Sequence, residues 1–347
     1  MSAATTDLFS PGGTVTGPDG GTQAPDEVTT RTRSGSRLFW DRFHDDKAAL
    51  AALVVIGILI LIALVGGPLA AWVTGHGNNA GFGDVNPHGP TTLDEFGLPK
   101  GPNSSFWFGS DGEGRDLFVR TMYGTRTSLI VGVVASVIAV LIGLVVGLIA
   151  GYFRGPVDTL LSRFGDVMLA IPALLISIGI VAACNSNKDG CVIGPHWLPW
   201  RPHIQQGLTL VICIIVLFTW SYIARLVRGY TLSLREKEFV EASRSLGASN
   251  TRIIVREILP NLAGPIIVFT TLLIPQTILY EAALSYLGLG VQSSTASWGG
   301  LLNDAQRFYD TAWFLMLFPG LMLVITTLAF NLLGDGLRDA LDVRADR

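Results

Sequence analysis

The chain has little charge for its length. Of its 347 residues, 15% are charged and 49% are hydrophobic, and the mean hydropathy is +0.48. An ordinary soluble domain carries about 25% charged residues, so this composition excludes that class and predicts a membrane protein. The net charge of -3 comes without a concentrated basic stripe. We therefore predict no binding of nucleic acid.

The chain also lacks the motifs of several enzyme classes. It has no G-x-x-x-x-G-K-[ST], and none of its lysines follows a glycine, so it cannot build a P-loop. No H-E-x-x-H is present, and every histidine lies outside the apolar runs, so no metal site is predicted. Ser110 and Asp111 are adjacent, but no histidine accompanies them in a supporting pattern. We predict no catalytic residue and no cofactor bound by this chain.

Long apolar runs dominate the sequence, and six of them are long enough to cross a bilayer as helices. The first follows a polar tail and lacks the small-residue cleavage site of a secretory signal, so it is predicted to be a permanent span. A count of five or seven spans, with one re-entrant segment, is the alternative. The six runs are Ala48–Val73, Ser128–Tyr152, Val167–Cys184, Gly207–Val227, Gly264–Leu287 and Ala312–Leu333.

The basic residues predict the orientation of these spans. Most lysines and arginines fall in segments that are cytoplasmic if the N-terminus is inside, so both termini are predicted to lie in the cytoplasm of a multi-pass plasma-membrane protein. The predicted organisation is a mostly disordered tail (1–46), a first transmembrane helix (47–73), an external loop (74–127), a five-helix core (128–333) containing an inner loop (229–263), and a second cytoplasmic tail (334–347).

The external loop ends in a run that mixes apolar side chains with arginines, from Gly114 to Leu129. This mixture predicts a helix lying on the membrane surface before the second span. Further along, Cys184 and Cys191 flank a short polar turn on the external side, where disulfides persist. We predict that they are bridged, and two free thiols are the alternative. Cys213 is predicted to be a small buried residue of the fourth span.

The charged segment Glu238–Asn261 lies between two apolar runs. Ser233 and Glu236 form an S-x-x-E capping box, which predicts a helix that ends at Gly247. A second helix is predicted to start at Ser249 or Asn250 and to end at Pro260. Phe239, Val240 and Leu246 would be exposed among the charges of this hairpin. An amphipathic hairpin of this kind requires a partner that covers its apolar face.

The stretch "EASRSLGASNTRIIVREILPN" resembles the EAA loop of ABC-importer permeases. Glu241, Ala242, Gly247, Leu259 and Pro260 stand at the matching positions, whereas Ser243 replaces the usual second alanine and Glu257 stands where the family often has isoleucine. The resemblance implies that the loop docks into a cleft on a separate ATPase, which binds ATP and Mg²⁺. The ATPase-coupling residues are predicted to be Phe239, Glu241, Ala242, Ser243, Leu246, Gly247, Leu259 and Pro260.

Two further segments, Phe108–Leu129 and Ser285–Asp342, resemble the second permease of the peptide and nickel branch of these importers. The resemblance implies the all-helical fold of a type I ABC importer. It also implies four partners besides membrane lipid: a second, homologous permease, two cytoplasmic ATPases and an extracytoplasmic binding protein. The implied substrate is a di- or oligopeptide, with nickel or a nickel chelate as the runner-up. A secondary transporter is the alternative of another class, but it leaves the hairpin unexplained.

Three features inside the spans are informative. Gly143, Gly147 and Gly151 form a stripe of small residues that predicts close helix packing, either within this chain or with a partner. Glu281 is a carboxylate within an apolar run, so it either faces a cavity or partner, or is hydrogen-bonded near the outer end of its helix. Glu281 and Pro275 are predicted candidates for the translocation path or gate. Four prolines are predicted to kink helices: Pro172, Pro265, Pro275 and Pro319.

Overall fold

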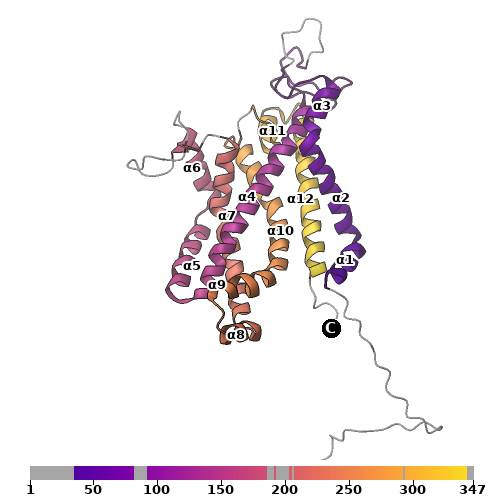
Figure 1. Cartoon of the computed structure of the whole chain (residues 1–347). Helices are drawn as coiled ribbons and strands as arrows, with labels where there is room; N and C mark the ends of the chain where they lie inside the picture. The colour runs from indigo at the N-terminus through magenta and orange to yellow at the C-terminus, as the bar shows by residue number, and fades with distance from the viewer. Residues whose placement is uncertain are drawn as a thin grey trace, which may run out of the picture.

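A computed structural model describes residues 35–81, 92–185, 191–192, 203–204, 207–291 and 294–341. Most of the predicted N-terminal tail lies outside these residues. The regular structure of the described part is helical, apart from the two-residue antiparallel strands β1 (Cys191–Val192) and β2 (His203–Ile204). Its helices form a bundle of long rods that run side by side (Figure 1). The prediction of an all-helical membrane protein is confirmed.

The helices follow the apolar runs, but most extend beyond them. The long ones are α2 (Lys47–Leu61), α4 (Leu117–Phe153), α7 (Leu208–Arg235), α10 (Leu259–Tyr286) and α12 (Phe314–Leu341). The shorter ones are α1 (Gly35–Asp45), α3 (Gly67–Thr74), α5 (Gly155–Ala170), α6 (Ala173–Asn185), α8 (Glu238–Ser245), α9 (Asn250–Arg252) and α11 (Trp298–Ala305). Two π-helical segments, Ile62–Gly66 and Ile253–Ile258, join neighbouring helices, and a 3-10 turn, Gln306–Phe308, follows α11.

Five helical segments of the described residues are long and apolar enough to cross a membrane, and a bent pair brings the number to six. The bent pair is α5 with the part of α6 up to Cys184, and its two helices meet at 82°. Pro172 lies at the break, where it supplies no backbone N–H for a continuous helix. The predicted kink at Pro172 is confirmed, but the predicted start of this span at Val167 is wrong. The helix begins earlier, at Gly155, and is divided by the proline.

The helix predicted to lie on the membrane surface is instead the first part of α4. The Asp116 carboxylate caps α4 by accepting from the backbone N–H groups of Phe118 and Val119, and its other oxygen lies 2.6 Å from His76 Nδ1. Leu117 and Val119 are buried. A helix on the membrane surface would leave one face in water. This first part of α4 is instead mostly buried by neighbouring elements, and it continues directly into the span.

The glycine stripe of α4 packs against α7 of the same chain. A Cβ atom added to Gly143, Gly147 or Gly151 would approach atoms of α7 to less than 3.0 Å, and for Gly147 the nearest is the carbonyl oxygen of Ala224 at 2.6 Å. The prediction of close packing is confirmed, and the neighbour that the sequence left open is α7. The two helices lie side by side along most of their length (Figure 1).

A second group of helices is formed by α10, α12 and α2. Leu272 of α10 packs on Gly334 of α12, and Ala49 of α2 packs on Gly336 of α12. The first span therefore packs on α12 through α2, and it also packs on α4 through α3, where Gly67 lies against the ring of Tyr123. The helices α10 and α12 continue through Pro265, Pro275 and Pro319, so of the four prolines only Pro172 divides a helix.

Candidate functional site: the hairpin and the buried polar clusters

The hairpin, residues Glu238–Asn261, lies at one end of the bundle, and the end opposite is here called the loop end (Figure 1). Gly247 has φ +78°, a left-handed conformation that favours glycine and ends α8. Ser249 then caps α9 through its hydroxyl oxygen, 3.4 Å from the Arg252 backbone nitrogen. The predicted turn at Gly247 and the predicted start at Ser249 are confirmed.

Two predicted helix boundaries in this region are wrong. No helix starts at Ser233, because α7 continues to Arg235 and the next helix, α8, starts at Glu238. Pro260 does not end the second helix. It lies in α10 directly after the π-helical segment Ile253–Ile258, and the helix continues through it. The hairpin is therefore continuous with two long helices, α7 and α10.

Val240 attaches the hairpin to the bundle. Its side chain is fully buried and belongs to a cluster with Ile253, Ile258 and Leu262. The prediction that Val240 is exposed is wrong, because α8 turns this residue towards the second helix of the hairpin. The opposite face of α8 is open: Leu246 is 88% exposed and Phe239 is 38% exposed.

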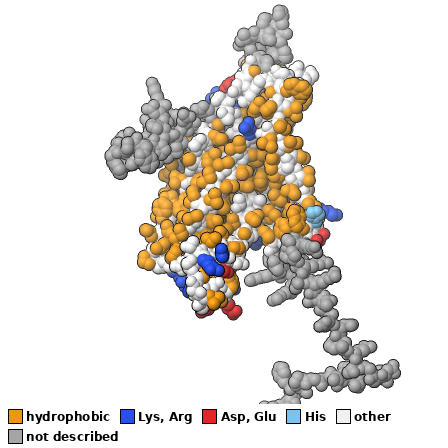
Figure 2. All heavy atoms as spheres, viewed as in Figure 1, with side chains coloured by type: hydrophobic (Ala, Val, Ile, Leu, Met, Phe, Trp, Pro, Cys, Tyr) orange, Lys and Arg blue, Asp and Glu red, His pale blue; other side chains and the backbone are white. Residues whose placement is uncertain are grey.

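The other predicted coupling residues differ in their exposure. Glu241, Ala242, Gly247 and Pro260 are exposed, whereas Ser243 and Leu259 are half-buried. Charged side chains gather over α8 at this end of the molecule, whereas hydrophobic side chains cover the adjoining side of the bundle (Figure 2). The hairpin thus presents an isolated leucine and a phenylalanine within a charged surface.

A group of polar contacts that the sequence did not predict joins the end of α4 to the hairpin and to the residues just before it. The Tyr152 hydroxyl donates to Asn250 Oδ1 at 2.8 Å, and the Arg235 guanidinium donates to the Tyr152 carbonyl while it lies 5.6 Å from the centre of the Tyr152 ring. The Arg154 guanidinium donates to Glu236 and lowers the pKa of that exposed carboxyl. These partners are about 80 to 100 residues apart, so no local spacing indicates them.

Glu281 is fully buried in α10. Its Oε1 accepts from the Ser285 hydroxyl at 2.7 Å, and its Oε2 accepts from the Ser128 hydroxyl of α4 at 3.1 Å. Ser128 also accepts from the backbone N–H of Trp298 at 3.3 Å, so the carboxylate joins α4, α10 and α11. Pro275 is buried on the same helix, and no hydrogen bond joins it to Glu281. The role of these two residues in a path or gate stays a prediction.

A buried cluster of charges lies at the loop end. Asp111 Oδ2 lies 2.7 Å from Arg115 Nε and 3.3 Å from Arg120 Nε. Arg115 also approaches Asp304 of α11 at 3.6 Å. Burial raises the pKa of the Asp304 carboxyl, and the Arg120 charge opposes this rise. No local sequence pattern groups these residues, because Asp304 is nearly 200 positions from the others.

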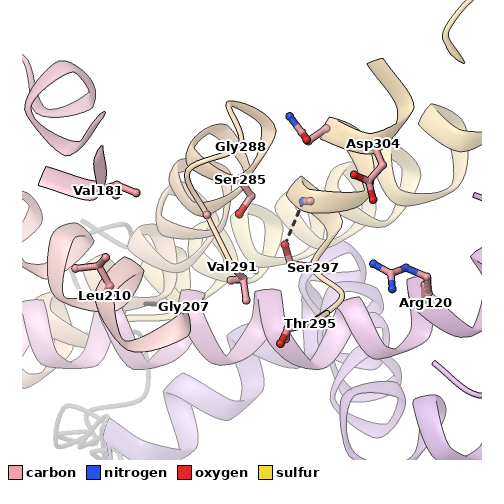
Figure 3. Close-up of a pocket in the computed structure, with 13 residues that line it drawn as sticks. Arg120, Val181, Gly207, Leu210, Ser285, Gly288, Val291, Thr295, Ser297 and Asp304 are labelled. Carbon is pink, nitrogen blue, oxygen red and sulfur yellow. Dashed lines mark hydrogen bonds between the residues drawn. The ribbon is translucent and has the colours of Figure 1, made fainter. Parts of the chain in front are cut away.

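A cavity of about 300 Å³ lies beside this cluster. Arg120 and Asp304 are at one end of it, Val181 and Leu210 at the other, and Ser297 lies between them (Figure 3). The Ser297 hydroxyl oxygen accepts from the backbone N–H of Gly300 at 3.1 Å and caps α11 (Figure 3). The cavity is therefore charged at one end and apolar at the other.

The cysteines differ in their states. Cys184 is disulfide-bonded, but the side chain of Cys191 lies outside the described residues, so the pairing of Cys184 with Cys191 stays a prediction. Cys213 is a free thiol and is exposed on α7. The prediction that it is buried is wrong, because it lies on a face of the helix that this chain leaves uncovered. The described residues contain no group of three or more potential metal ligands.

Comparisons with known proteins agree with this architecture. Residues 143–347 match the family described as "Binding-protein-dependent transport system inner membrane component". Residues 34–91 match the "N-terminal TM domain of oligopeptide transport permease C". Over 318 residues, 92% of each chain, the protein is 38% identical to the glutathione transport system permease protein GsiD of Escherichia coli O6:K15:H31 (strain 536 / UPEC) and to that of Shigella boydii serotype 4 (strain Sb227).

Among solved structures, the chain is similar to the MetNI methionine ABC transporter in inward-facing conformations. In one crystal form the TM-score is 0.49 at 20% identity, with 63% of this chain and 93% of that chain covered. In another the TM-score is 0.48 at 18% identity, with 61% and 91% covered.

The fold and the hairpin define a class, that of the membrane-embedded subunits of transport complexes. The chain belongs to the family of binding-protein-dependent transport system inner-membrane components. Within that family it is a permease subunit of a type I ABC importer of the peptide and nickel branch, of the second or C type. It is not an enzyme, and the ATPase is a separate chain.

Proposed function

We propose that this permease carries di- or oligopeptides across the plasma membrane. The support is the 38% identity to permeases named for glutathione, which is itself a tripeptide, over 92% of both chains. The match of residues 34–91 to a domain of oligopeptide transport permease C agrees with the same substrate class. Nickel or a nickel chelate is the runner-up for this branch.

We further propose that the hairpin couples the permease to its ATPases. The observation that carries this proposal is that Leu246, at 88% exposure, stands on a hairpin that Val240 holds rigidly to the bundle. Exposing a leucine to water is unfavourable, and a partner groove that covers it would gain this free energy. Phe239 and Ala242 lie on the same open surface and would enter the same groove.

The proposed complex contains a second, homologous permease, two cytoplasmic ATPases that bind ATP and Mg²⁺, and an extracytoplasmic binding protein. This chain then binds no cofactor of its own. Both termini are proposed to be cytoplasmic. In support, α1 and the C-terminal end of α12 lie at the same end of the bundle as the hairpin (Figure 1), as six crossings require. Peptide is proposed to cross between the two permeases.

Truncation of the hairpin leucine tests the coupling proposal. Leu246→Ala removes an exposed side chain, so the permease should fold normally but retain much less ATPase during purification of the complex. Tyr309→Ala is the matched control, because Tyr309 is 63% exposed at the loop end and should leave ATPase retention unchanged. Full retention of ATPase by Leu246→Ala would contradict the proposal.

Uptake by the complete complex in proteoliposomes tests the substrate. We expect accumulation of labelled dipeptides, glutathione or longer peptides that depends on ATP and on the binding protein. Accumulation of ⁶³Ni²⁺ without any peptide would overturn the peptide proposal in favour of nickel, and uptake driven by an ion gradient without ATPase would overturn both.

A further inference from the structure

Two arginine–aspartate pairs join α7 to α5 at the hairpin end of the bundle. Arg225 Nη2 lies 2.6 Å from Asp166 Oδ1. One turn along α7, the Arg228 guanidinium donates to both oxygens of Asp158, and its Nη2 lies 2.7 Å from Oδ2. In these pairs both arginines are on α7 and both aspartates are on α5.

The Arg225–Asp166 pair, which is the farther of the two from the hairpin along α7, lies within the depth of the bilayer. Arg225 follows a run without charged residues that starts at Leu208, and 17 residues of helix rise by about 25 Å. The hydrocarbon layer is about 30 Å thick. The Arg225–Asp166 pair is therefore inside the half of that layer nearer to the hairpin. A long arginine side chain can extend to the headgroups from this depth, but an aspartate is too short to do so.

Both side chains of this pair remain open. Arg225 is 60% exposed and Asp166 is 49% exposed. A half-exposed carboxylate at this depth is strongly unfavourable in lipid, where neither water nor backbone donors solvate it. The face of the bundle that carries the pair therefore faces water or a polar partner, although exposed apolar residues of α5 such as Leu160 and Val167 flank it.

A cavity of about 600 Å³ opens at the pairs, between α4, α5 and α7. Its walls include Gly147 and Ala150 of α4, Thr159 and Gly165 of α5, and Ser221 of α7. These side chains are small or hydroxylated, so the cavity offers space and hydrogen-bonding groups together. Its volume is in the range of pockets that hold small molecules.

The two pairs differ in how tightly they are held. Asp158 is 15% exposed and makes a bidentate pair with Arg228, a geometry that fixes α5 on α7. The Arg225–Asp166 pair has one contact and is open on both sides. An exposed ion pair contributes little net stability. Arg225 and Asp166 can therefore release each other and pair with the charged groups of a ligand at a small cost in free energy.

We propose that this cavity is the section of the transport path nearest the hairpin, and that Arg225 and Asp166 bind the two charged ends of a peptide by exchanging partners. This inference rests on the proposed peptide function. Arg225 takes the terminal carboxylate, which matches a guanidinium in geometry and charge, and Asp166 takes the terminal ammonium. The Arg228–Asp158 pair holds the wall of the cavity in place.

Water access at the level of the pair is the first test. In the complete complex, with Cys213→Ala as background, Gly165→Cys places a thiol in the cavity, because its Cβ has only Ser221 Cβ near it, at 4.0 Å. Val167→Cys is the control at the same depth, since Val167 is 55% exposed and does not line the cavity. A membrane-impermeant methanethiosulfonate should label the first roughly 100-fold faster, because the reactive thiolate does not form in hydrocarbon.

Addition of peptide and binding protein should slow the labelling of Gly165→Cys during turnover and leave Val167→Cys unchanged. Equal labelling rates for the two cysteines would overturn the proposal. So would a crosslink of Gly165→Cys to the second permease that excludes water, because the polar surroundings would then be a subunit interface. The comparison of the two labelling rates without peptide needs no transport, so it stays valid even if the wild-type complex carries no peptide.

Charge substitution is the second test. Arg225→Gln should reduce uptake of a dipeptide with a free carboxylate by roughly tenfold, the effect of one charge-assisted contact, and should change uptake of the corresponding dipeptide amide much less. The binding protein meets both peptides before the permease does, and its own preference is the same for wild type and variant. The measurement is therefore the ratio of dipeptide uptake to dipeptide-amide uptake, compared between wild type and variant. Asp166→Asn should act in the same way on N-acetylated peptides.

The exchanged pair, Arg225→Asp with Asp166→Arg, should recover more uptake than either single change, because the cavity keeps one charge of each sign. Wild-type uptake ratios in Arg225→Gln and Asp166→Asn would overturn the proposal. If the wild-type complex transports no peptide at all, the proposed function fails, and the cysteine labelling alone then decides whether the cavity holds water.

Discussion

The Tyr152 hydroxyl donates a hydrogen bond to Asn250 Oδ1 across 2.8 Å, between residues 98 positions apart. Tyr152 lies in the last turn of α4, and Asn250 is the first residue of α9 in the hairpin. Because the glycine stripe of α4 packs directly on α7, a displacement of the hairpin reaches two long helices at once. The bond thus connects the proposed ATPase-docking surface to the centre of the bundle.

Removal of this bond should weaken the connection without disrupting the fold. Tyr152→Phe keeps the buried ring and deletes the hydroxyl, so we expect a loss of about 0.5–1.5 kcal/mol in stability and less peptide transported per ATP hydrolysed. Thermal unfolding and the ratio of uptake to ATP hydrolysis in the complete complex measure the two effects. Tyr230→Phe is the control, because Tyr230 is exposed on α7. An unchanged ratio for Tyr152→Phe would show that the bond transmits nothing.

The glycine stripe should tolerate no side chain. In Gly147→Ala the new Cβ would lie 2.6 Å from the Ala224 carbonyl oxygen, so α4 and α7 must separate, at a cost of about 1–3 kcal/mol. Gly57→Ala is the matched control, since a Cβ there meets nothing within 4 Å. We expect a lower unfolding temperature and less folded protein for Gly147→Ala alone. Equal behaviour of the two variants would contradict the close packing.

Glu281 should be replaceable by a side chain of the same shape. In Glu281→Gln the carbonyl oxygen still accepts from Ser285, and the amide donates to the Ser128 hydroxyl, which rotates to accept. We expect near-normal stability. Glu281→Leu leaves both buried hydroxyls without this partner and should cost about 1–3 kcal/mol. If Glu281→Gln assembles and unfolds normally but loses uptake, the carboxylate has a role in transport beyond joining the helices.

The stability of the loop end should depend on pH through Asp304. Burial raises its pKa above the ordinary value of 3.8, so the folded chain holds this proton more tightly than the unfolded chain. The resulting stabilisation is complete below 3.8 and is lost as the pH rises through the folded pKa. Relative to Asp304→Asn, the wild type should therefore become less stable as the pH rises above 3.8.

Unfolding temperatures of the two proteins across about pH 3.5 to about pH 7 check this expectation. Asp310→Asn is the control, because Asp310 is exposed at the same end of the molecule. A difference between wild type and Asp304→Asn that is constant with pH, or that grows in favour of the wild type as the pH rises, would contradict the sign of the shift.

Several features of the fold were predictable because their causes are local. An apolar run longer than the bilayer core predicts a span whatever surrounds it. Gly247 tolerates a left-handed conformation that few other residues adopt, and the Ser249 side chain reaches the backbone three residues on, so each signals a helix boundary by itself. Pro172 lacks a backbone N–H in any context, so a kink there was predictable, although the size of the bend was not.

The misplaced features depend on residues far away in the sequence. The segment after Asp116 has the composition of a surface helix, yet it is buried because the rest of the loop end covers it. Val240 is apolar like its exposed neighbour Phe239, but the orientation of α8 places the Val240 side chain against Ile253 and Ile258. The residue pattern within a single helix predicts neither outcome, because the burial of a side chain depends on which other helices and loops pack against it.

The sequence by itself determined the class of this protein: its apolar runs predict a membrane protein, and the resemblance of its charged hairpin to the EAA loop implies a permease driven by a separate ATPase. Only the tertiary structure decided which polar and charged side chains meet. Asp166 and Arg225 are 59 residues apart, and Ser128 and Glu281 are 153 apart. Such pairs form because the packing of α4, α5, α7 and α10 brings their side chains within hydrogen-bond distance, where electrostatic attraction acts.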